Sequence, residues 1–378
     1  MKTHPMPPRE WFRAALVPIL AAALLACGAP EPAEIRHVEI MTWNLQLLFD
    51  GTEDGTEFAQ FRESAGWTQE KYLGRLNVIA RVIGEMERAP DIIALQEIES
   101  PRVVEDLAAA LGVHRYDWTH FARLPGMALG VGLLSRFPIG WAMAHSADIY
   151  GEVTPRPVLE ARIDVPGGSA EGGGGDARSF LLFVCHWKSK RGGADETESL
   201  RRASARVILR RMRELALTDP DLPAIVVGDL NVTHDEFFRG GGEAVRSLMP
   251  DDPEAVDAVL AERGIRTAGE LQADFIVVTH DKPPEARYFP AGTIALYSPW
   301  TVEKEGGSFF FRNSWETIDH FLLSAHFFGG GGWEFRGSRA LDMPPFVGAD
   351  GLPNAYNPRT GRGISDHLPL LLFLGLAE

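Results

Sequence analysis

Short runs of apolar residues recur along the chain and predict buried β-strands. Some of them are continuous, such as Ile92-Ile93-Ala94-Leu95, and a strand covered on both faces has this pattern. The predicted strands span residues 38–43, 91–96, 130–135, 158–164, 179–186, 223–229, 318–323 and 368–373. Sheets built from such strands need a covering layer on each face.

Amphipathic helices are predicted between these strands, at residues 69–88, 101–111 and 196–217. The third helix places its apolar residues along one approximate seam, as a helix that covers a sheet does. No long linker interrupts the alternation of strands and helices, so we expect one α/β domain over residues 38–378, a two-sheet sandwich with outer helices. Residues 166–176, with six glycines, predict a mobile hairpin tip.

The N-terminus has the pattern of an export signal. Basic residues precede an apolar run at residues 14–26, which is too short to span a membrane but is typical of a signal peptide. The tetrad Leu24-Leu25-Ala26-Cys27 resembles the bacterial lipobox, in which the cysteine is acylated. We therefore expect a signal peptide at residues 1–26, a lipidated Cys27 with a tether over residues 27–37, and lipid anchoring to a membrane of the bacterial cell envelope. The alternative is a plain secretory signal cleaved nearby.

Composition and charge narrow the classes of function. The chain has 378 residues, 45 % hydrophobic and 24 % charged, with a formal net charge of −15, which is typical of a folded globular protein. A protein with a net negative charge does not bind polyanions through its overall charge. Any phosphate chemistry must therefore be local and assisted by a metal. Residues 186–213, with nine Lys or Arg and three acids, are the exception. They favour either a polyanionic partner or the solvated face of an amphipathic helix.

Polar residues stand at the ends of several predicted strands, where a buried strand normally avoids them. They are Asn44, Glu97, His186, Asp229 and Asn231, together with Asp319 near the start of one strand and Asp366-His367 just before the last. The ends of adjacent strands meet on one face of a sandwich. We therefore expect these side chains to converge on one site.

The oxygen-bearing residues of this set suit hydrolysis of a phosphoester with a hard cation. Mg²⁺ prefers carboxylate and amide oxygens and keeps several waters, so Asn44, Glu97 and Asp366 are its expected ligands. Mn²⁺ or Ca²⁺ could take the same place.

The remaining polar residues suit acid–base work around an attacking water. His367 could act on that water, with Asp319 fixing its tautomer and supporting its positive charge. Asp229 and Asn231, two apart on an extended segment, would point the same way, toward the water and the phosphoryl oxygens. His186 and Lys188 also share a face, and they could donate hydrogen bonds to the developing negative charge.

These residues lie in short motifs whose order along the chain is informative. The motifs are Thr42-Trp43-Asn44, Leu95-Gln96-Glu97, His186-Trp187-Lys188-Ser189, Gly228-Asp229-Leu230-Asn231, Ile318-Asp319-His320 and Ser365-Asp366-His367-Leu368-Pro369. In order and spacing the set resembles the endonuclease/exonuclease/phosphatase superfamily, the deoxyribonuclease-like metal-dependent phosphoesterases. The resemblance implies a four-layer αββα sandwich, dependence on Mg²⁺ and cleavage of a P–O bond by activated water.

The resemblance also implies roles for single residues. Asn44, Glu97 and Asp366 resemble the family's metal-side residues, Asp229 and Asn231 those around the nucleophile, and Asp319 with His367 the acid–base pair. His186 resembles a second histidine of the deoxyribonuclease and sphingomyelinase branches. Arg156 stands roughly where family members place a phosphate-binding arginine. Whether one or two metal ions act stays open.

Several of these residues also have a purely structural interpretation. Asn44 could cap a turn, Glu97 could cap the following helix, and residues 229–231 could form an Asx turn. Structural roles alone would not place all of them in the order of one family, so the set favours a site.

The sequence thus predicts an exported, lipid-anchored, Mg²⁺-dependent phosphodiesterase with nucleic acid as the favoured substrate. One alternative is an enzyme of the sphingomyelinase or phosphoinositide-phosphatase kind, and another is a surface lipoprotein that keeps the fold as a binding module without turnover. Intact candidate catalytic residues favour an enzyme. No protein partner is inferred, and the substrate, the membrane leaflet and the oligomeric state stay open.

Overall fold

A computed structural model describes residues 35–146, 148–149, 152–153, 156–167, 178–262, 274–280, 293–300 and 306–377. The predicted signal peptide, Cys27 and most of the glycine-rich hairpin tip lie outside the described residues. The described residues within 36–165 and 178–377 belong to one compact unit. Every helix and strand named below belongs to this unit.

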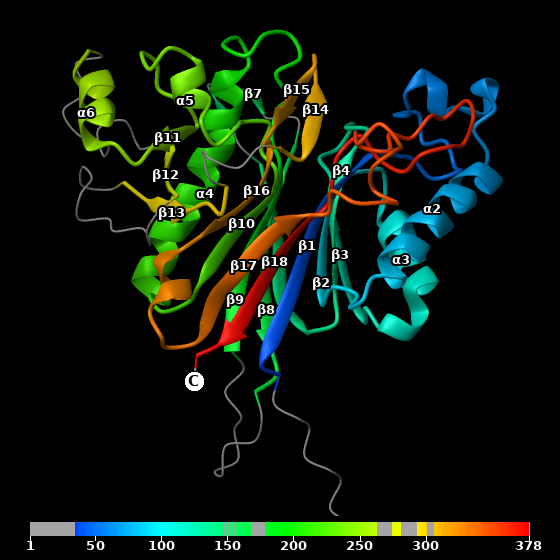
Figure 1. The fold of residues 1–378 in the computed structure, drawn as a ribbon, viewed down its shortest axis with the longest axis horizontal. Coiled ribbons are helices and arrows are strands. Elements are labelled where there is room, and N and C mark those ends of the chain that lie inside the picture. The colour runs from blue at the N-terminus through cyan, green and yellow to red at the C-terminus, as the bar shows by residue number, and fades with distance from the viewer. Residues whose placement is uncertain are drawn as a thin grey trace, which may run out of the picture. The chain divides into compact units, whose positions relative to one another are not determined.

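One sheet has six strands in the order β17-β18-β1-β2-β4-β3. Its members are β1 (His37–Leu48), β2 (Ile92–Ile98), β3 (Trp118–Ala122), β4 (Gly130–Ser135), β17 (Trp333–Ala340) and β18 (Leu370–Leu376). The central strands β1 and β2 run parallel, whereas β18 pairs with β1 in antiparallel fashion. The strands that come first and last along the chain, β1 and β18, therefore lie side by side in this sheet; in Figure 1 they are blue and red.

The second sheet has eight strands in the order β11-β12-β13-β16-β10-β9-β8-β5. They are β5 (Ile139–His145), β8 (Val158–Val165), β9 (Arg178–His186), β10 (Ala224–Asp229), β11 (Leu248–Pro250), β12 (Ile276–Thr279), β13 (Ala295–Tyr297) and β16 (Asp319–Leu323). Strands β9 and β10 are parallel, and β10 and β16 are antiparallel. Two small hairpins, β6 (Asp148–Ile149) with β7 (Glu152–Val153) and β14 (Phe309–Phe311) with β15 (Ser314–Glu316), stand apart from both sheets.

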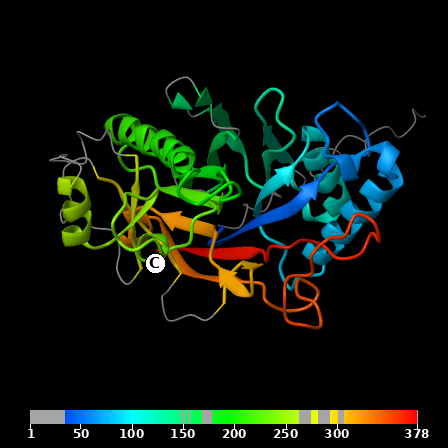
Figure 2. The ribbon, with the colours of Figure 1, turned by 90° about the horizontal axis from the view of Figure 1, so that it is seen from above.

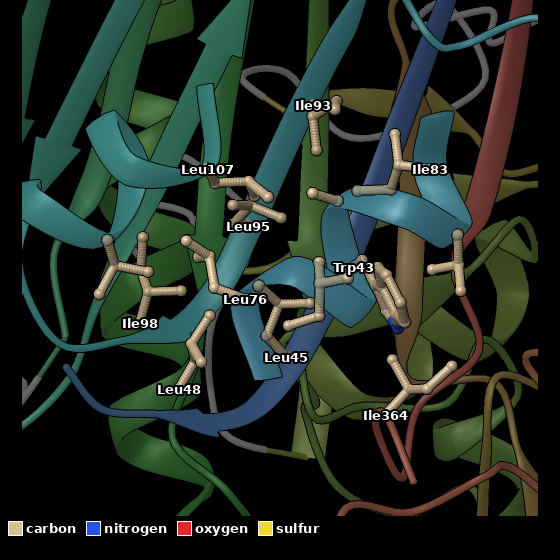
Figure 3. Packing of buried hydrophobic residues seen from close by; sticks show 14 of the residues in the cluster. Trp43, Leu45, Leu48, Leu76, Ile83, Ile93, Leu95, Ile98, Leu107 and Ile364 are labelled. Atoms are coloured by element: carbon tan, nitrogen blue, oxygen red, sulfur yellow. The ribbon is translucent and has the colours of Figure 1, made fainter. Parts of the chain in front are cut away.

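Helices cover the outer face of each sheet (Figures 1 and 2). Helices α2 (Gln69–Gly84) and α3 (Pro101–Leu111) share one buried apolar cluster with β1 and β2. Figure 3 shows Trp43, Leu76, Leu95 and Leu107 of this cluster. Helices α4 (Glu198–Thr218) and α6 (Pro253–Glu262) share a second cluster with the other sheet. The short helix α5 (Glu236–Arg239) and 3₁₀ turns at Ala59–Phe61, Glu63–Ala65, Gly112–His114 and Ala325–Phe328 complete the described elements.

Alternation along β1 explains how its residues serve both the core and the site. Met41 and Trp43 belong to the cluster beneath α2 and α3. Thr42 and Asn44, which alternate with them along the strand, point to the other face, as the two-residue period of a strand requires. There the Thr42 hydroxyl donates to Oε1 of Gln96 at 3.2 Å, and Nδ2 of Asn44 donates to Oδ2 of Asp229, in the opposite sheet, at 3.0 Å. The predicted four-layer αββα sandwich of two mixed sheets is confirmed.

No helix of the described residues is long and apolar enough to cross a membrane.

Candidate active site

The predicted site residues lie at one end of both sheets, at the edge of a single cavity. The cavity has a volume of about 740 Å³ and is lined by Glu97, His186, Asp229, Asn231, Asp366 and His367, among others. Asn44 and Asp319 are buried and hydrogen-bond residues that line it. Strands from both sheets thus bring residues far apart in the sequence to one place.

Glu97 reaches the cavity through a break in strand β2. Its backbone has a φ of 59°, in the left-handed region, and the pairing of β2 with β4 shifts between Gln96 and Ile98. A bulge of this kind re-aims a side chain at the end of a strand. Oε2 of Glu97 accepts a hydrogen bond from the backbone N–H of Leu47 at 2.9 Å. The carboxylate is therefore held by β1 and does not cap the helix that follows β2.

The buried Asp229 and the half-buried Glu97 and Asp366 give the cavity a strongly acidic character. Burial raises the pKa of Glu97 and the nearby Asp366 raises it further, while Arg156 and His367 oppose both effects. Burial also raises the pKa of Asp366. For Asp229, burial and the charge of Asp319 raise the pKa to about 7. A cation bound beside these carboxyl groups would stabilise their ionised form and so lower their pKa values again.

A buried imidazole–carboxylate pair lies on the other side of the cavity floor. Nδ1 of His367 donates to Oδ2 of Asp319 at 2.8 Å. Burial would lower the pKa of His367, but the charge and the hydrogen bond of Asp319, with the charges of Asp366 and Asp229, raise it to about 10. His367 is thus a cation at neutral pH, and its Nε2 lies 4.0 Å from Oδ1 of Asp366.

The backbone around His367 is fixed by contacts that the sequence did not reveal. The Ser365 hydroxyl donates to the carbonyl of Asn44 at 2.6 Å and accepts from the His367 backbone N–H at 3.1 Å. Nε1 of Trp43 donates to the His367 carbonyl at 2.9 Å. The Phe309 ring stacks on the imidazole with 4.6 Å between centroids. These contacts set the plane of the imidazole.

Asp229 and Asn231 form a local turn and also face the cavity. The Asn231 backbone N–H donates to Oδ1 of Asp229 at 2.8 Å, and Asn231 has a φ of 53°. The preceding Gly228 has a φ of 128°, and a Cβ there would lie 2.1 Å from the carbonyl oxygen of Cys185, so only glycine fits. The predicted Asx turn is thus formed by two of the predicted site residues themselves. Asn44 also has both roles, because it accepts from the Gln46 N–H at 3.0 Å and donates to Asp229.

His186 lies between the two carboxylates that face it. Its Nε2 is 3.5 Å from Oδ2 of Asp229 and 3.6 Å from Oε1 of Glu97. Burial, with the charges of Arg156 and His367, holds the pKa of His186 well below its ordinary value. It is therefore a neutral hydrogen-bonding group at pH 7.

Of the two residues predicted to contact phosphate, only Arg156 is directed at the site. It donates to the Trp187 carbonyl, which also accepts from Nδ2 of Asn231, and its charge acts on Glu97 and Asp229. The contact of Lys188 with phosphate stays a prediction, and Lys188 is not among the residues that line the cavity. Its Nζ turns to the carbonyls of Ser189 at 3.2 Å and Arg191 at 3.3 Å. Strand β9 ends at His186, so the two-residue alternation on which that prediction depended does not continue to Lys188.

The rim of the cavity carries further residues that sequence reasoning did not assign. Lys190, Arg191 and Arg312 are the cations of the rim, and the half-buried Phe309 and the exposed Phe311 are its phenylalanines. Lys190 pairs with Glu236 at 2.6 Å. The basic stretch at residues 186–213 was visible in the sequence, but which of its members face the cavity depends on tertiary contacts.

Several arginines of the basic helix α4 pair with acidic residues of the fold. Arg201 is buried against Glu198 at 2.7 Å, and Arg202 and Arg206 both pair with Asp274. Arg211 pairs with Glu160 at 2.8 Å. These arginines serve the fold.

The donor atoms of the site fit a divalent metal ion. Asp229 and Asp319 each place one carboxylate oxygen within 4.8 Å of the other. Oδ1 of Asp319 is buried and has no hydrogen-bond partner among the described residues. Carboxylate oxygens around an acidic cavity are what hard divalent cations select. The expected set of Asn44, Glu97 and Asp366 and this second set adjoin the same cavity.

A mixed two-sheet sandwich with such a site at its strand ends defines a phosphoesterase fold. A model of the endonuclease/exonuclease/phosphatase family matches residues 39–239. The chain belongs to that family. No curated protein matches the chain.

Solved structures of low identity resemble the chain. An endonuclease/exonuclease/phosphatase family protein from Bacteroides thetaiotaomicron is 17 % identical, covering 91 % of this chain and 97 % of its own, with a TM-score of 0.47. A mannosyl-6-phosphatase from the same organism is 18 % identical, with coverages of 89 % and 99 % and a TM-score of 0.45. The catalytic domain of human Nocturnin is 16 % identical, with coverages of 91 % and 96 % and a TM-score of 0.48.

Proposed function

We propose that the protein is a Mg²⁺-dependent phosphodiesterase that cleaves nucleic acid. The observation that carries the proposal is the position of the buried His367–Asp319 pair, 2.8 Å apart, on the same cavity as the Glu97, Asp229 and Asp366 carboxylates. An imidazolium and a cation-binding carboxylate cluster together stabilise the charge that develops when water attacks phosphorus.

Asn44, Glu97 and Asp366 would hold the metal ion. When bound, the ion supplies Lewis-acid polarisation of a phosphoryl oxygen. Arg156 lies near enough to act on Glu97 and Asp229 electrostatically, and it can offset part of their charge before the ion arrives. Neutral His186, within 3.6 Å of Glu97, can then donate to a substrate oxygen.

Asp229 and Asn231 are the groups that orient the attacking water. Both line the cavity, and the turn between them fixes their relative position through the 2.8 Å bond from the Asn231 N–H to Asp229. A carboxylate is the better acceptor for the water's proton, because His367 is already protonated at neutral pH. His367 therefore donates from Nε2 to the developing charge, and Asp319 stabilises that positive charge.

An aromatic column on the rim favours nucleic acid over a lipid headgroup. Phe309 stacks on His367, Phe311 stacks on Phe309 with 6.0 Å between centroids, and the Arg312 guanidinium lies 5.2 Å from the Phe311 ring. Phe311 is 47 % exposed. A planar base attached to the scissile phosphate can stack on such a column, and stacking is tolerant of sequence.

The test is a substrate panel with a matched pair of variants. Single- and double-stranded DNA, RNA, sphingomyelin, a phosphoinositide and a generic alkyl phosphodiester are each assayed with Mg²⁺ and with EDTA. We expect Mg²⁺-dependent cleavage of nucleic acid, a several-fold higher KM for nucleic acid in Phe311→Ala, and no change for the alkyl diester, which has no ring to stack. The control is Phe238→Ala, which removes a 60 % exposed phenylalanine on α5. Preferential cleavage of a lipid, or no turnover of any substrate, would refute the proposal.

Export and lipid anchoring at Cys27 belong to the same proposal. They are supported by the basic, apolar and lipobox pattern of residues 1–27. A lipidated Cys27 would tether the catalytic unit to an envelope membrane and confine it to substrates outside the cytoplasm.

A further inference from the structure

A second group of carboxylates lies outside the cavity, where the loop after β1 meets the end of β2. The loop reads Asp-Gly-Thr-Glu twice in succession, over residues 50–57. Asp54 and Glu57 of this loop and Glu99 after β2 each place one carboxylate oxygen within 4.8 Å of the others. None of the three lines the candidate active site.

Two of these three carboxylates are almost completely buried. Glu57 is 2 % exposed and Glu99 is 1 % exposed. Like charges gathered in a buried place repel each other, and each has also lost its solvation.

One carboxylate oxygen of this cluster has no partner in the described part of the protein. Oε2 of Glu99 accepts from the Asp50 N–H at 2.6 Å, but Oε1 is buried and has no hydrogen-bond partner among the residues that the structure describes. Both oxygens of Glu57 accept from backbone N–H groups, Oε1 from Asp54 and Oε2 from Gly55 at 3.0 Å. The Arg123 guanidinium pairs with Asp54 at 2.8 Å, and Asp54 is the exposed member of the cluster. In the described part of the chain no ion pair joins a basic side chain to Glu57 or Glu99.

We propose that Asp54, Glu57 and Glu99 bind a Ca²⁺ ion at a site separate from the active site. Ca²⁺ takes six to eight oxygen ligands in a flexible arrangement that includes carboxylates, carbonyls and waters, whereas Mg²⁺ needs near-octahedral ligands. A loop with glycines at 51 and 55, the latter with a φ of 95°, can adapt its carboxylates and carbonyls to such an ion. An ion there would take up the unpartnered Oε1 of Glu99 and neutralise the buried charge.

The site joins the two strands that carry Asn44 and Glu97. The Glu99 N–H donates to the Leu48 carbonyl at 3.1 Å, and the Ser100 hydroxyl donates to Oδ2 of Asp50 at 2.8 Å. An ion held by Glu99 and by the loop after β1 therefore fixes the ends of β1 and β2 relative to each other. Its effect is on the stability of the fold, and it does not depend on the proposed phosphodiesterase activity.

The experiment measures thermal unfolding and calorimetric Ca²⁺ binding of the full chain after treatment with EDTA. We expect Ca²⁺ to raise the Tm by several degrees, with a Kd of about 10⁻⁴ to 10⁻³ M, the range of extracellular modules. Glu99→Gln and Glu57→Gln should each abolish the shift and weaken binding at least about tenfold. In EDTA the Tm of Glu99→Gln should equal or exceed that of the wild type, because the substitution removes a repelled buried charge.

Two controls separate this site from its surroundings. Glu53→Gln changes an exposed acid of the same loop that is not in the cluster, and Asp366→Asn changes a ligand expected at the active site; both should keep the Ca²⁺ shift. Loss of the shift in Asp366→Asn but not in Glu57→Gln would overturn the proposal, as would an unchanged Tm of the wild type. An equal destabilisation of Glu99→Gln with and without Ca²⁺ would overturn it too, because the carboxylate would then act without an ion. An equal shift with Mg²⁺ in Asp366→Asn, which lacks an expected active-site ligand, would overturn the assignment to Ca²⁺.

Discussion

His367 and Asp319, 48 residues apart in sequence, meet across the sandwich, with Nδ1 of His367 2.8 Å from Oδ2 of Asp319. Asp319 begins β16 of the eight-stranded sheet, and His367 precedes β18 of the six-stranded sheet. The pair therefore exists only when the two sheets pack correctly. Its geometry links the integrity of the fold directly to the chemistry of the site.

Removing either member of this pair should disable the same catalytic step. His367→Ala and Asp319→Ala should each lower kcat by about 10²- to 10⁴-fold, the scale of general acid–base assistance. Because the residues act as a unit, the double variant should be little worse than the poorer single variant. Steady-state kinetics at saturating Mg²⁺ measure this coupling.

The neighbouring His320 provides the control for that cycle. It is buried, and its Nε2 lies 2.7 Å from the Val232 carbonyl oxygen, away from the cavity. His320→Gln should leave kcat within a few-fold of the wild type. Multiplicative losses in the double variant, or a loss in His320→Gln as large as that in His367→Ala, would show that the wrong residues have been paired.

Glu97→Gln should separate metal binding from folding. The substitution keeps an oxygen that can accept from the Leu47 N–H but removes the charge that attracts a divalent ion. Mutation of residues that only support metal ligands costs about 10- to 100-fold, so loss of a ligand should lower activity more than about 100-fold. Calorimetric Mg²⁺ titration should show weaker binding at a nearly unchanged Tm. Unfolding with unaltered metal affinity would make Glu97 a structural residue.

The central strands and the strand-end chemistry could be predicted from the sequence for a local reason. Strands such as β2 and β10 are buried on both faces, so they are continuous apolar runs, and a polar residue at their end stands out. The partly exposed strands β5 and β17 lack such runs and were missed. Exposure on one face removes the signal on which the prediction depends.

Contacts between distant segments could not be predicted in the same way. Ser365 supports Asn44 across 321 positions of sequence, and nothing in the composition around Ser365 indicates that contact. The direction of the Lys188 side chain could not be predicted by alternation either, because Lys188 lies beyond the end of β9 at His186. Pairing of Arg202 and Arg206 with Asp274 likewise turns a basic stretch of sequence into part of the fold.

Lipidation can be tested through the two cysteines of the chain, Cys27 and Cys185. Cys27→Ala should lose incorporation of labelled fatty acid and leave the membrane fraction, because the acyl acceptor is gone. Cys185→Ala is the matched control, since Cys185 is completely buried in β9, and it should keep both label and location. Metabolic labelling and membrane fractionation measure the two outcomes. Persistence of the label in Cys27→Ala would exclude a lipoprotein.

His234 should make the protein less stable in mild acid. Burial lowers its pKa to about 4, in a site where its Nδ1 lies 2.7 Å from the Thr317 hydroxyl. The unfolded chain, with a histidine pKa near 6.5, then binds a proton that the folded protein excludes. The free energy of unfolding should therefore fall as the pH decreases from about 6.5 to about 4.

Urea unfolding at several pH values across this range measures how steeply the free energy of unfolding depends on pH. His234→Gln should reduce that slope. His37→Gln, at an exposed position, should leave the slope unchanged. An identical slope in wild type and His234→Gln would show that other groups cause the acid sensitivity.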